Sequence, residues 1–184
     1  MSTKIPSITT AEQLLAAPYD LGPCELVRGE LVMMTPAGEE HSQIEGNLHL
    51  ALGPYVRTHG LGRVYMGDAG FLLERNPDTV RAPDVAVVRS SRASAAPHKG
   101  YFPGPPDLAV EIRSPEDRPK DIAAKIEEYL GLGVQVVWDI DPGKRTVTVH
   151  RAGSDPETLD ENGQLTEPTL LPGFEMPVRE LFAW

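Results

Sequence analysis

The stretch 106–142, PDLAVEIRSPEDRPKDIAAKIEEYLGLGVQVVWDIDP, constrains the fold of this chain more than any other part. It contains a short apolar run at 107–113, an amphipathic run from about Pro119 to Leu132, and a second apolar run at 134–140. Short apolar runs are typical of buried strands, and apolar residues at helical spacing are typical of a helix packed on a core. The stretch therefore predicts a strand, a turn, a helix and a strand.

The first of these strands carries a charge in its middle. Side chains alternate between the two faces of a strand, so Leu108, Val110 and Ile112 share one face, and Glu111 and Arg113 share the other. A lone buried carboxylate costs several kcal/mol or shifts its pKa, so it usually has a metal, a cation or hydrogen-bond donors beside it. Two interpretations of Glu111 stay open: a functional ligand, or a structural ion pair with Arg113 or a neighbouring strand.

Composition limits the class of protein. A chain of 184 residues is expected to form one domain, 1–184, and its single Cys24 excludes an internal disulfide and any multi-cysteine metal site. Neither a leader pattern nor an apolar run long enough to span a membrane is present, so we expect a soluble, cytoplasmic protein. The net charge of −10 argues against a protein that coats nucleic acid through bulk electrostatics, but it leaves room for a local basic groove.

Periodicity and turn residues predict the remaining elements. Before the central stretch we expect a short helix over Ser7–Ala17 capped by Thr10, a hairpin over Cys24–Met34, and a helix over His41–Gly60 bent near Pro54. One or two strands over Leu61–Leu73 should follow, then a core strand over Val80–Val88 that is entered at Pro83-Asp84, and a long loop over Arg89–Pro106. After the central stretch we expect a strand over Thr146–Arg151 and a docked tail at Leu170–Trp184. The loop between the two acid-bearing strands is either a flexible connection or a segment that faces a substrate.

Asp84 and Glu111 are the central pair of candidate site residues, each on its own predicted core strand. If the strands are adjacent, the two carboxylates lie close together and repel each other, and a divalent cation relieves that repulsion. Oxygen ligands favour Mg²⁺ or Mn²⁺ over zinc. Such an ion can polarise a phosphoryl oxygen and activate a water molecule.

Two further side chains lie at the edge of predicted apolar helix faces. Lys125 lies one turn from Tyr129, and a lysine in such a place is usually a snorkelling surface residue. His41 lies in the first turn of its helix on the apolar side, where a histidine is usually a half-buried structural residue. Glu25 and Glu30, which flank the hairpin turn, are most simply explained as exposed strand carboxylates; the alternative is that either leans toward a site, if the hairpin packs over it.

Several segments in this order resemble a known family. These are CELVRGEL from Cys24, the His41 helix, RAPDVAVV from Arg81, PDLAVEIRSP from Pro106, the segment from Lys125 to Tyr129, and GVQVVWDIDP from Gly133. Together they are similar to a bacterial endonuclease family within the PD-(D/E)XK restriction-endonuclease-like superfamily. The resemblance covers about 18–151, most of the chain, and leaves 152–184 as a tail docked on that core.

The resemblance implies an α/β fold of mixed α+β type, in which a central mixed sheet is flanked by helices and extended by β-hairpins. It implies that Asp84, Glu111 and the main-chain carbonyl of Ile112 bind Mg²⁺, with Mn²⁺ as a substitute, and that a lysine orients or deprotonates the attacking water. It raises His41, in the first core helix, to a candidate additional ligand. Glu45 and then Glu30 are the next candidates for that ligand.

The chain departs from the family pattern at one position. Arg113 occupies the place of the motif lysine, and a guanidinium cannot act as a base, although it can stabilise negative charge. Lys125, on the following helix, matches the place where this family keeps a lysine, so we expect Lys125 to position the water and Arg113 to support it.

Three functions follow from these expectations. The first is a metal-dependent endonuclease that hydrolyses DNA, with DNA as its partner and no membrane. The second, which the arginine and the acidic charge motivate, is a nuclease fold kept as a nucleic-acid or protein binding module without catalysis. The third is a hydrolase of another phosphoester. Exposed strand edges leave a homodimer open as an alternative to a monomer.

Overall fold

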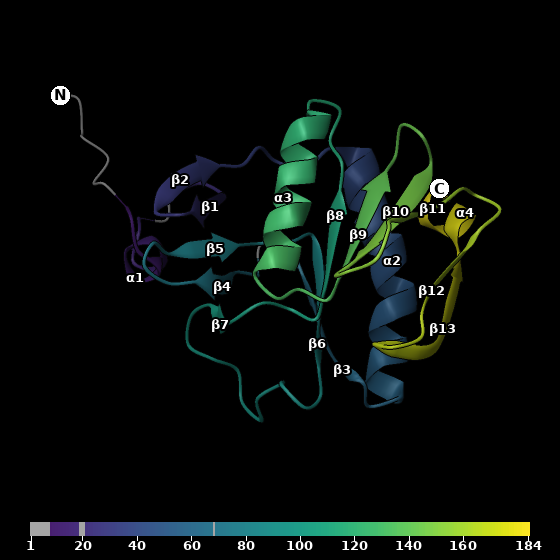
Figure 1. The fold of residues 1–184 in the computed structure, drawn as a ribbon, viewed down its shortest axis with the longest axis horizontal. Helices are drawn as coiled ribbons and strands as arrows, with labels where there is room; N and C mark the ends of the chain where they lie inside the picture. Colours follow the sequence, from purple (N-terminus) through teal and green to yellow (C-terminus); the bar gives the residue numbers. More distant parts are fainter. Residues whose placement is uncertain (1–7, 19–20, 68) are drawn as a thin grey trace.

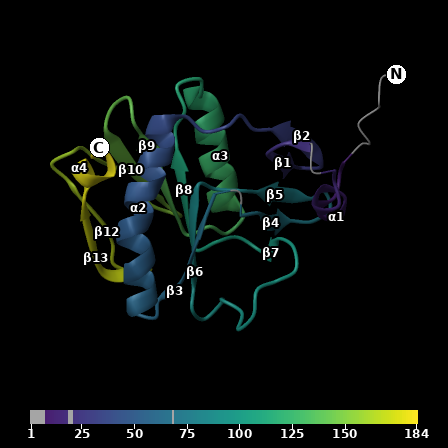
Figure 2. The ribbon, with the colours of Figure 1, turned by 180° about the vertical axis from the view of Figure 1, so that it is seen from behind.

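The computed structural model describes residues 8–18, 21–67 and 69–184. Figure 1 shows a central sheet with helix α3 on one face, and Figure 2, from behind, shows helix α2 on the other. A second sheet, formed by β1, β2, β4, β5 and β7, extends from one side of this layered core. The mixed sheet with flanking helices and added hairpins confirms the fold class predicted from the sequence.

The central sheet has six strands in the order β11-β10-β9-β8-β6-β3. Strands β8 and β9 are parallel, and the other neighbours in this sheet are antiparallel. The bounds are β3 (Gly62–Met66), β6 (Val85–Arg89), β8 (Leu108–Ile112), β9 (Val136–Asp141), β10 (Thr146–Arg151) and β11 (Glu157–Leu159). The apolar runs predict β8, β9 and β10 to within two residues.

The second sheet has five strands in the order β2-β1-β5-β4-β7. The bounds are β1 (Cys24–Val27), β2 (Glu30–Met33), β4 (Phe71–Glu74), β5 (Thr79–Arg81) and β7 (Phe102–Pro103). The turn of the β1–β2 hairpin is formed by Arg28 and Gly29, both with positive φ, which matches the right-handed twist of the flanking strands. The predicted hairpin is therefore confirmed.

The helices are α1 (Ala11–Leu15), α2 (Glu39–Thr58), α3 (Pro119–Gly131) and α4 (Val178–Leu181). Helix α2 packs Ile44, Leu48 and Leu52 on one face of the central sheet. Helix α3 packs Ile126 and Tyr129 on the other. None of the helices in the described part of the chain is long and apolar enough to cross a membrane.

The tail adds a short sheet of β12 (Gln164–Glu167) and β13 (Leu171–Pro177), followed by α4. Leu181 and Phe182 are buried against α2, as a docked tail requires, but the side chain of Trp184 is exposed. The last aromatic residue of the tail therefore lies outside the core.

Two details differ from the sequence predictions. The segment Val80–Val88 is not one strand, because its first residues belong to β5 in the second sheet and Pro83-Asp84 leads from there into β6. Proline removes a ladder donor, which explains why pairing stops there. In the N-terminal helix, Thr10 caps as expected, but the helix ends at Leu15 and not at Ala17; Ser7 lies outside the described residues.

The long loop 90–106 lies at the end of β6 and β8 that is opposite to Asp84 and Glu111. Buried Asp107 holds this end by accepting hydrogen bonds from the main-chain nitrogen of Arg89 and from Gln135, and it forms ion pairs with Arg89 and Arg92. Its place does not favour the interpretation as a segment that faces a substrate, and the predicted loop is interrupted by β7, which pairs with β4.

Candidate active site

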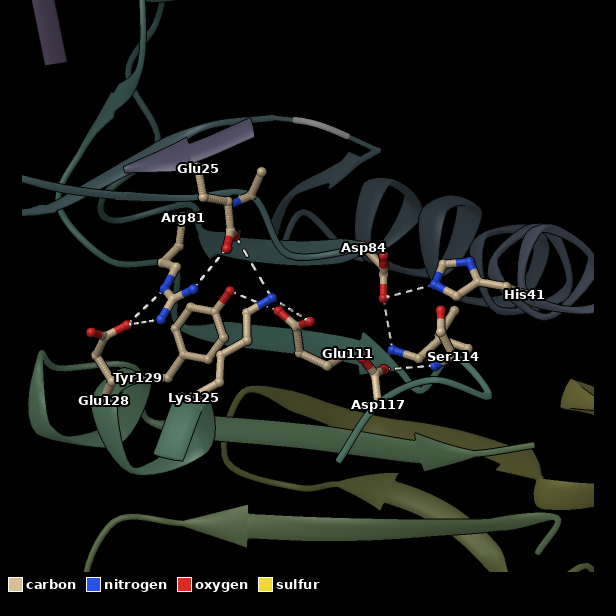
Figure 3. A network of polar contacts seen from close by, with 12 residues as sticks. Glu25, His41, Arg81, Asp84, Glu111, Ser114, Asp117, Lys125, Glu128 and Tyr129 are labelled. Carbon is tan, nitrogen blue, oxygen red and sulfur yellow. Dashed lines mark hydrogen bonds and ion pairs between the residues drawn. The ribbon is translucent and has the colours of Figure 1, made fainter. Parts of the chain in front are cut away.

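Asp84 and Glu111 lie beside each other at one end of the central sheet (Figure 3). In the antiparallel pair β6–β8, Val85 is opposite Val110, so the residue before β6 meets the end of β8. Asp84 Oδ2 accepts a hydrogen bond of 2.7 Å from the main-chain nitrogen of Ile112. The two acids that the sequence places on separate strands are therefore brought together.

Glu111 faces α3 because strand alternation turns it away from the large core beneath Leu108, Val110 and Ile112. Its two carboxylate oxygens have separate donors: Lys125 Nζ is 2.7 Å from Oε2, and the hydroxyl of Tyr129 is 2.7 Å from Oε1. Lys125 and Tyr129 are one helical turn apart, so a single face of α3 holds this carboxylate.

Burial raises the pKa of Glu111 to about 7. The positive charge of Lys125 lowers this pKa, whereas the negative charges of Asp84 and Glu25 raise it. Glu111 is thus a carboxylate crowded by other carboxylates, which is the electrostatic situation that a bound cation relieves.

Lys125 lies between two carboxylates. Besides its contact with Glu111, its Nζ is 3.6 Å from Glu25 Oε1. Burial lowers the pKa of Lys125, but the charges of Glu111 and Glu25 outweigh burial and raise it. The lysine is therefore an ammonium held inside the site, and the usual explanation of a lysine at the edge of an apolar helix face, a snorkelling surface residue, does not apply to it.

His41, in the first turn of α2, faces Asp84, with 3.3 Å between its Nε2 and Asp84 Oδ2. This hydrogen bond raises the pKa of His41; burial lowers it, and the charges of Asp84, Glu45 and Glu111 raise it further. Its Nδ1 is buried and has no hydrogen-bond partner among the described residues. The histidine thus belongs to the acidic cluster rather than to the apolar core.

The other two candidate ligands are Glu45 and Glu30. Glu45 Oε1 accepts a hydrogen bond of 3.2 Å from the main-chain nitrogen of Gly67, and Glu30 is exposed on the hairpin. Of the histidine and these two glutamates, His41 is the side chain that contacts Asp84.

Arg113 points away from the two acids of the pair. Its Nε and Nη2 lie 2.8 and 2.6 Å from the two carboxylate oxygens of Asp139, and its Nη1 lies 3.2 Å from Asp141. Burial raises the pKa of Asp139, but the hydrogen bonds from Arg113, with His150 3.8 Å away, outweigh burial and hold it below its ordinary value. Arg113 therefore does not bridge Asp84 and Glu111.

Four residues of the site were missed in the sequence or assigned only to the fold: Glu25, Arg81, Glu128 and Tyr129. Arg81 joins the second sheet to α3, with Nη1 2.7 Å from Glu25 Oε2 and Nε 2.6 Å from Glu128 Oε2. Glu25 is buried and is not the exposed strand carboxylate that was expected. Alternation with Leu26 places Glu25 on the opposite face of β1, and the sequence carries no signal that this face is covered as well.

A cavity of about 390 Å³ opens beside Glu111 and Lys125. It is walled by Val27 and Val32 of the hairpin on one side and by Ile122 of α3 on another. The hairpin and the first half of α3 thus form the approach to the carboxylates.

The donor types fit a divalent cation of the magnesium class. Among the described residues, no group of three or more His, Cys, Asp and Glu side chains is already arranged around one point. Asp84 and Glu111 nevertheless supply oxygen ligands from adjacent strands, and a carboxylate has about four lone-pair sites, so Lys125 and Tyr129 leave part of Glu111 free.

Comparison with known proteins gives the family. A family model described as "Uma2: Putative restriction endonuclease" matches residues 11–179. The crystal structure of "a putative nuclease belonging to DUF820" from Anabaena variabilis ATCC 29413 is similar, with a TM-score of 0.79, 22% sequence identity, and coverage of 94% of this chain and 97% of that chain. No curated protein matches the chain. The resemblance inferred from the sequence is thus confirmed: the chain belongs to the Uma2 family of restriction-endonuclease-like proteins.

Proposed function

We propose that this protein is a divalent-metal-dependent endonuclease that hydrolyses phosphodiester bonds in DNA. The observation that carries the proposal is the meeting of Asp84 and Glu111 at one end of two neighbouring strands, with Lys125 paired to Glu111 at 2.7 Å. The family description supports the nuclease part of the proposal.

In this proposal Asp84 and Glu111 hold Mg²⁺ or Mn²⁺, the main-chain carbonyl of Ile112 adds an oxygen, and His41 completes the set beside Asp84. When bound, the ion polarises the phosphate and increases the acidity of a coordinated water. Its preference for oxygen donors agrees with the two carboxylates.

The chain's own side chains have separate tasks. Lys125, an ammonium beside Glu111, donates a hydrogen bond that orients the attacking water. Tyr129 holds the other oxygen of Glu111, so the carboxylate cannot rotate freely. Arg113, held by Asp139, keeps a positive charge near the cavity, where it attracts the phosphate backbone.

A binding module without catalysis is the second candidate. Arg113 in the motif position favours it, since arginine is no base and its guanidinium is already paired with Asp139. The placement of Lys125 on Glu111 favours an enzyme instead, because a second element supplies the ammonium that the strand lacks. For either candidate function we propose a cytoplasmic location. A homodimer is an alternative to a monomer, and hydrolysis of another phosphoester is the third possible function.

Nicking of a supercoiled plasmid tests the proposal. With Mg²⁺ or Mn²⁺ the wild type should convert the plasmid to open circles, and excess chelator or Asp84→Asn should abolish this. Asp155→Asn is the matched control, because Asp155 is exposed and lies in the tail. Equal nicking by wild type and Asp84→Asn, or none by either, would contradict the proposal.

Cleavage of a small phosphodiester but not of the plasmid would move the function to the other class of phosphoester hydrolases. DNA binding that is independent of metal, without cleavage, would favour the binding module.

A further inference from the structure

Glu25 brings the N-terminal hairpin into contact with the candidate active site. It lies on β1 of the second sheet, yet its side chain is only 4% exposed and reaches the face of α3 that carries Lys125 (Figure 3). Buried carboxylates are stable in proteins only when donors or cations surround them. Its contacts therefore explain why this charge is tolerated.

Two contacts fix the position of the Glu25 carboxylate. Oε1 accepts a hydrogen bond of 2.8 Å from the main-chain nitrogen of Ala82, and Oε2 is 2.7 Å from Arg81 Nη1. Arg81 is itself bound to Glu128 of α3. Glu25 is thus attached to the segment that leads into Asp84 and, through Arg81, to the helix that carries Lys125.

Lys125 is the remaining neighbour of Glu25. The distance of 3.6 Å between Lys125 Nζ and Glu25 Oε1 is that of an ion pair, whereas Nζ is at hydrogen-bond distance from Glu111. Ala82 and Arg81 already satisfy both oxygens of Glu25, so the lysine is not needed to satisfy this carboxylate. The end group of the lysine, in contrast, depends on its neighbours for order: Glu111, Glu25 and the ring of Tyr129, whose centroid is 5.9 Å from Nζ. A long flexible side chain is ordered only when its end is held.

We propose that Glu25 is a positioning residue, which restrains the ammonium of Lys125 between the hairpin and Glu111. The proposal rests on the function proposed above, in which Lys125 orients the attacking water. Without Glu25, Lys125 has one carboxylate partner instead of two, and its end group samples positions away from the reacting phosphate. A small displacement of this kind lowers the turnover rate more than it lowers substrate binding.

The order of the Lys125 side chain tests the positioning directly. The chain has five lysines, so ¹³C labelling at lysine Cε gives a small set of signals, and Lys125→Met identifies the one that belongs to Lys125. Glu25→Gln keeps the size of the side chain and an oxygen for Ala82, but it removes the charge. We expect the order parameter of the Lys125 Cε group to fall in this variant, to below about 0.6, the range of flexible groups.

Glu74→Gln is the matched control, since Glu74 is an exposed glutamate at the end of β4 in the same sheet. It should leave the Lys125 order parameter unchanged. An unchanged value in Glu25→Gln would overturn the proposal, whether or not the protein cleaves DNA.

Cleavage kinetics provide a second test of the role of Glu25. Glu25→Gln should lower kcat about ten-fold with KM nearly unchanged, and it should cause no further loss in a Lys125→Met background. Equal fold losses in both backgrounds would overturn the proposal, because Glu25 would then act on the fold and not through Lys125.

If the wild type does not cleave DNA, the proposed function is contradicted, and the order parameter of Lys125 alone decides the role of Glu25.

If Glu25→Gln does not fold, as judged by circular dichroism, Glu25→Asp replaces it. Aspartate keeps the charge for Arg81 but is one methylene shorter, so it withdraws from Lys125 and should give the same loss of order.

Discussion

The carboxylate of Asp84 accepts a 2.7 Å hydrogen bond from the main-chain nitrogen of Ile112, the residue that follows Glu111. This bond continues the ladder between β6 and β8 past the last paired residues, with a side chain in the place of a main-chain carbonyl. It ties the position of Asp84 to the strand that carries Glu111. The separation of the two acids is therefore set by the sheet and not by flexible side chains.

Lys125→Met should abolish most of the cleavage. Methionine keeps the length of the side chain but removes the ammonium beside Glu111, so we expect kcat to fall by about 10²-fold or more. Lys120 is an exposed lysine on the same helix, so Lys120→Met should change kcat little. Plasmid nicking under single-turnover conditions measures both, and equal rates for wild type and Lys125→Met would contradict the role of Lys125.

Arg113→Ala should act mainly on stability. It leaves the buried Asp139 without its bidentate partner, and because the guanidinium is partly exposed we expect a loss of about 2 kcal/mol in the free energy of unfolding. Arg118→Ala, which breaks an exposed pair with Asp121, should have no measurable effect. Urea unfolding checks both. A hundred-fold loss of cleavage without a loss of stability would instead place Arg113 among the catalytic groups.

The Asp139 carboxylate should make stability depend on pH. Its pKa in the folded protein is below the ordinary value of 3.8, so the folded state releases this proton more readily than the unfolded state does. The ionised Asp139 therefore contributes fully to the free energy of unfolding when the pH is above the ordinary pKa of 3.8. This contribution is lost as the pH falls through the lowered pKa of the folded protein. Asp139→Asn should destabilise the protein more at about pH 7 than at about pH 3. Urea unfolding at both pH values tests this, and an equal difference at both would contradict it.

Tyr129→Phe should weaken the hold on Glu111. The buried hydroxyl donates to Glu111 Oε1, and the loss of a hydrogen bond to a charged group should cost about 1.5 kcal/mol of folding free energy. Cleavage should also fall, because the carboxylate gains rotational freedom. Tyr65→Phe is the comparison, since the ring of Tyr65 packs edge-on against Phe71 in another part of the core. Thermal unfolding measures the stability of both variants. Equal losses of stability in Tyr129→Phe and Tyr65→Phe would contradict a specific role of Tyr129.

The elements that sequence patterns predict well are those whose stability comes from local apolar spacing. The apolar runs of β8 and β9 and the helical spacing of α3 place these elements near their observed bounds. The run 80–88 is different, because local pattern does not tell which sheet a strand joins. The tertiary pairing of β5 with β1 on one side and with β4 on the other assigns it to the second sheet.

The same limit applies to the site. Asp84 and Glu111 are visible in the sequence as charges at the ends or in the middle of apolar strands, and the resemblance to a family points to Lys125. For Glu25 the sequence leaves two alternatives open, an exposed carboxylate or one that leans toward the site, since its burial depends on how the hairpin packs against Arg81 and α3. The direction of Arg113 is not visible in the sequence, because Asp139 lies on β9, which becomes the neighbour of β8 only after folding.

The central claim is that Asp84 and Glu111 bind one divalent cation together, and calorimetric titration with Mn²⁺ tests it most directly. The wild type should bind about one equivalent, while Asp84→Asn and Glu111→Gln, each folded by circular dichroism, should both lose this binding, and Asp155→Asn should retain it. Unchanged Mn²⁺ binding in either site variant, or no binding by the wild type, would contradict the claim.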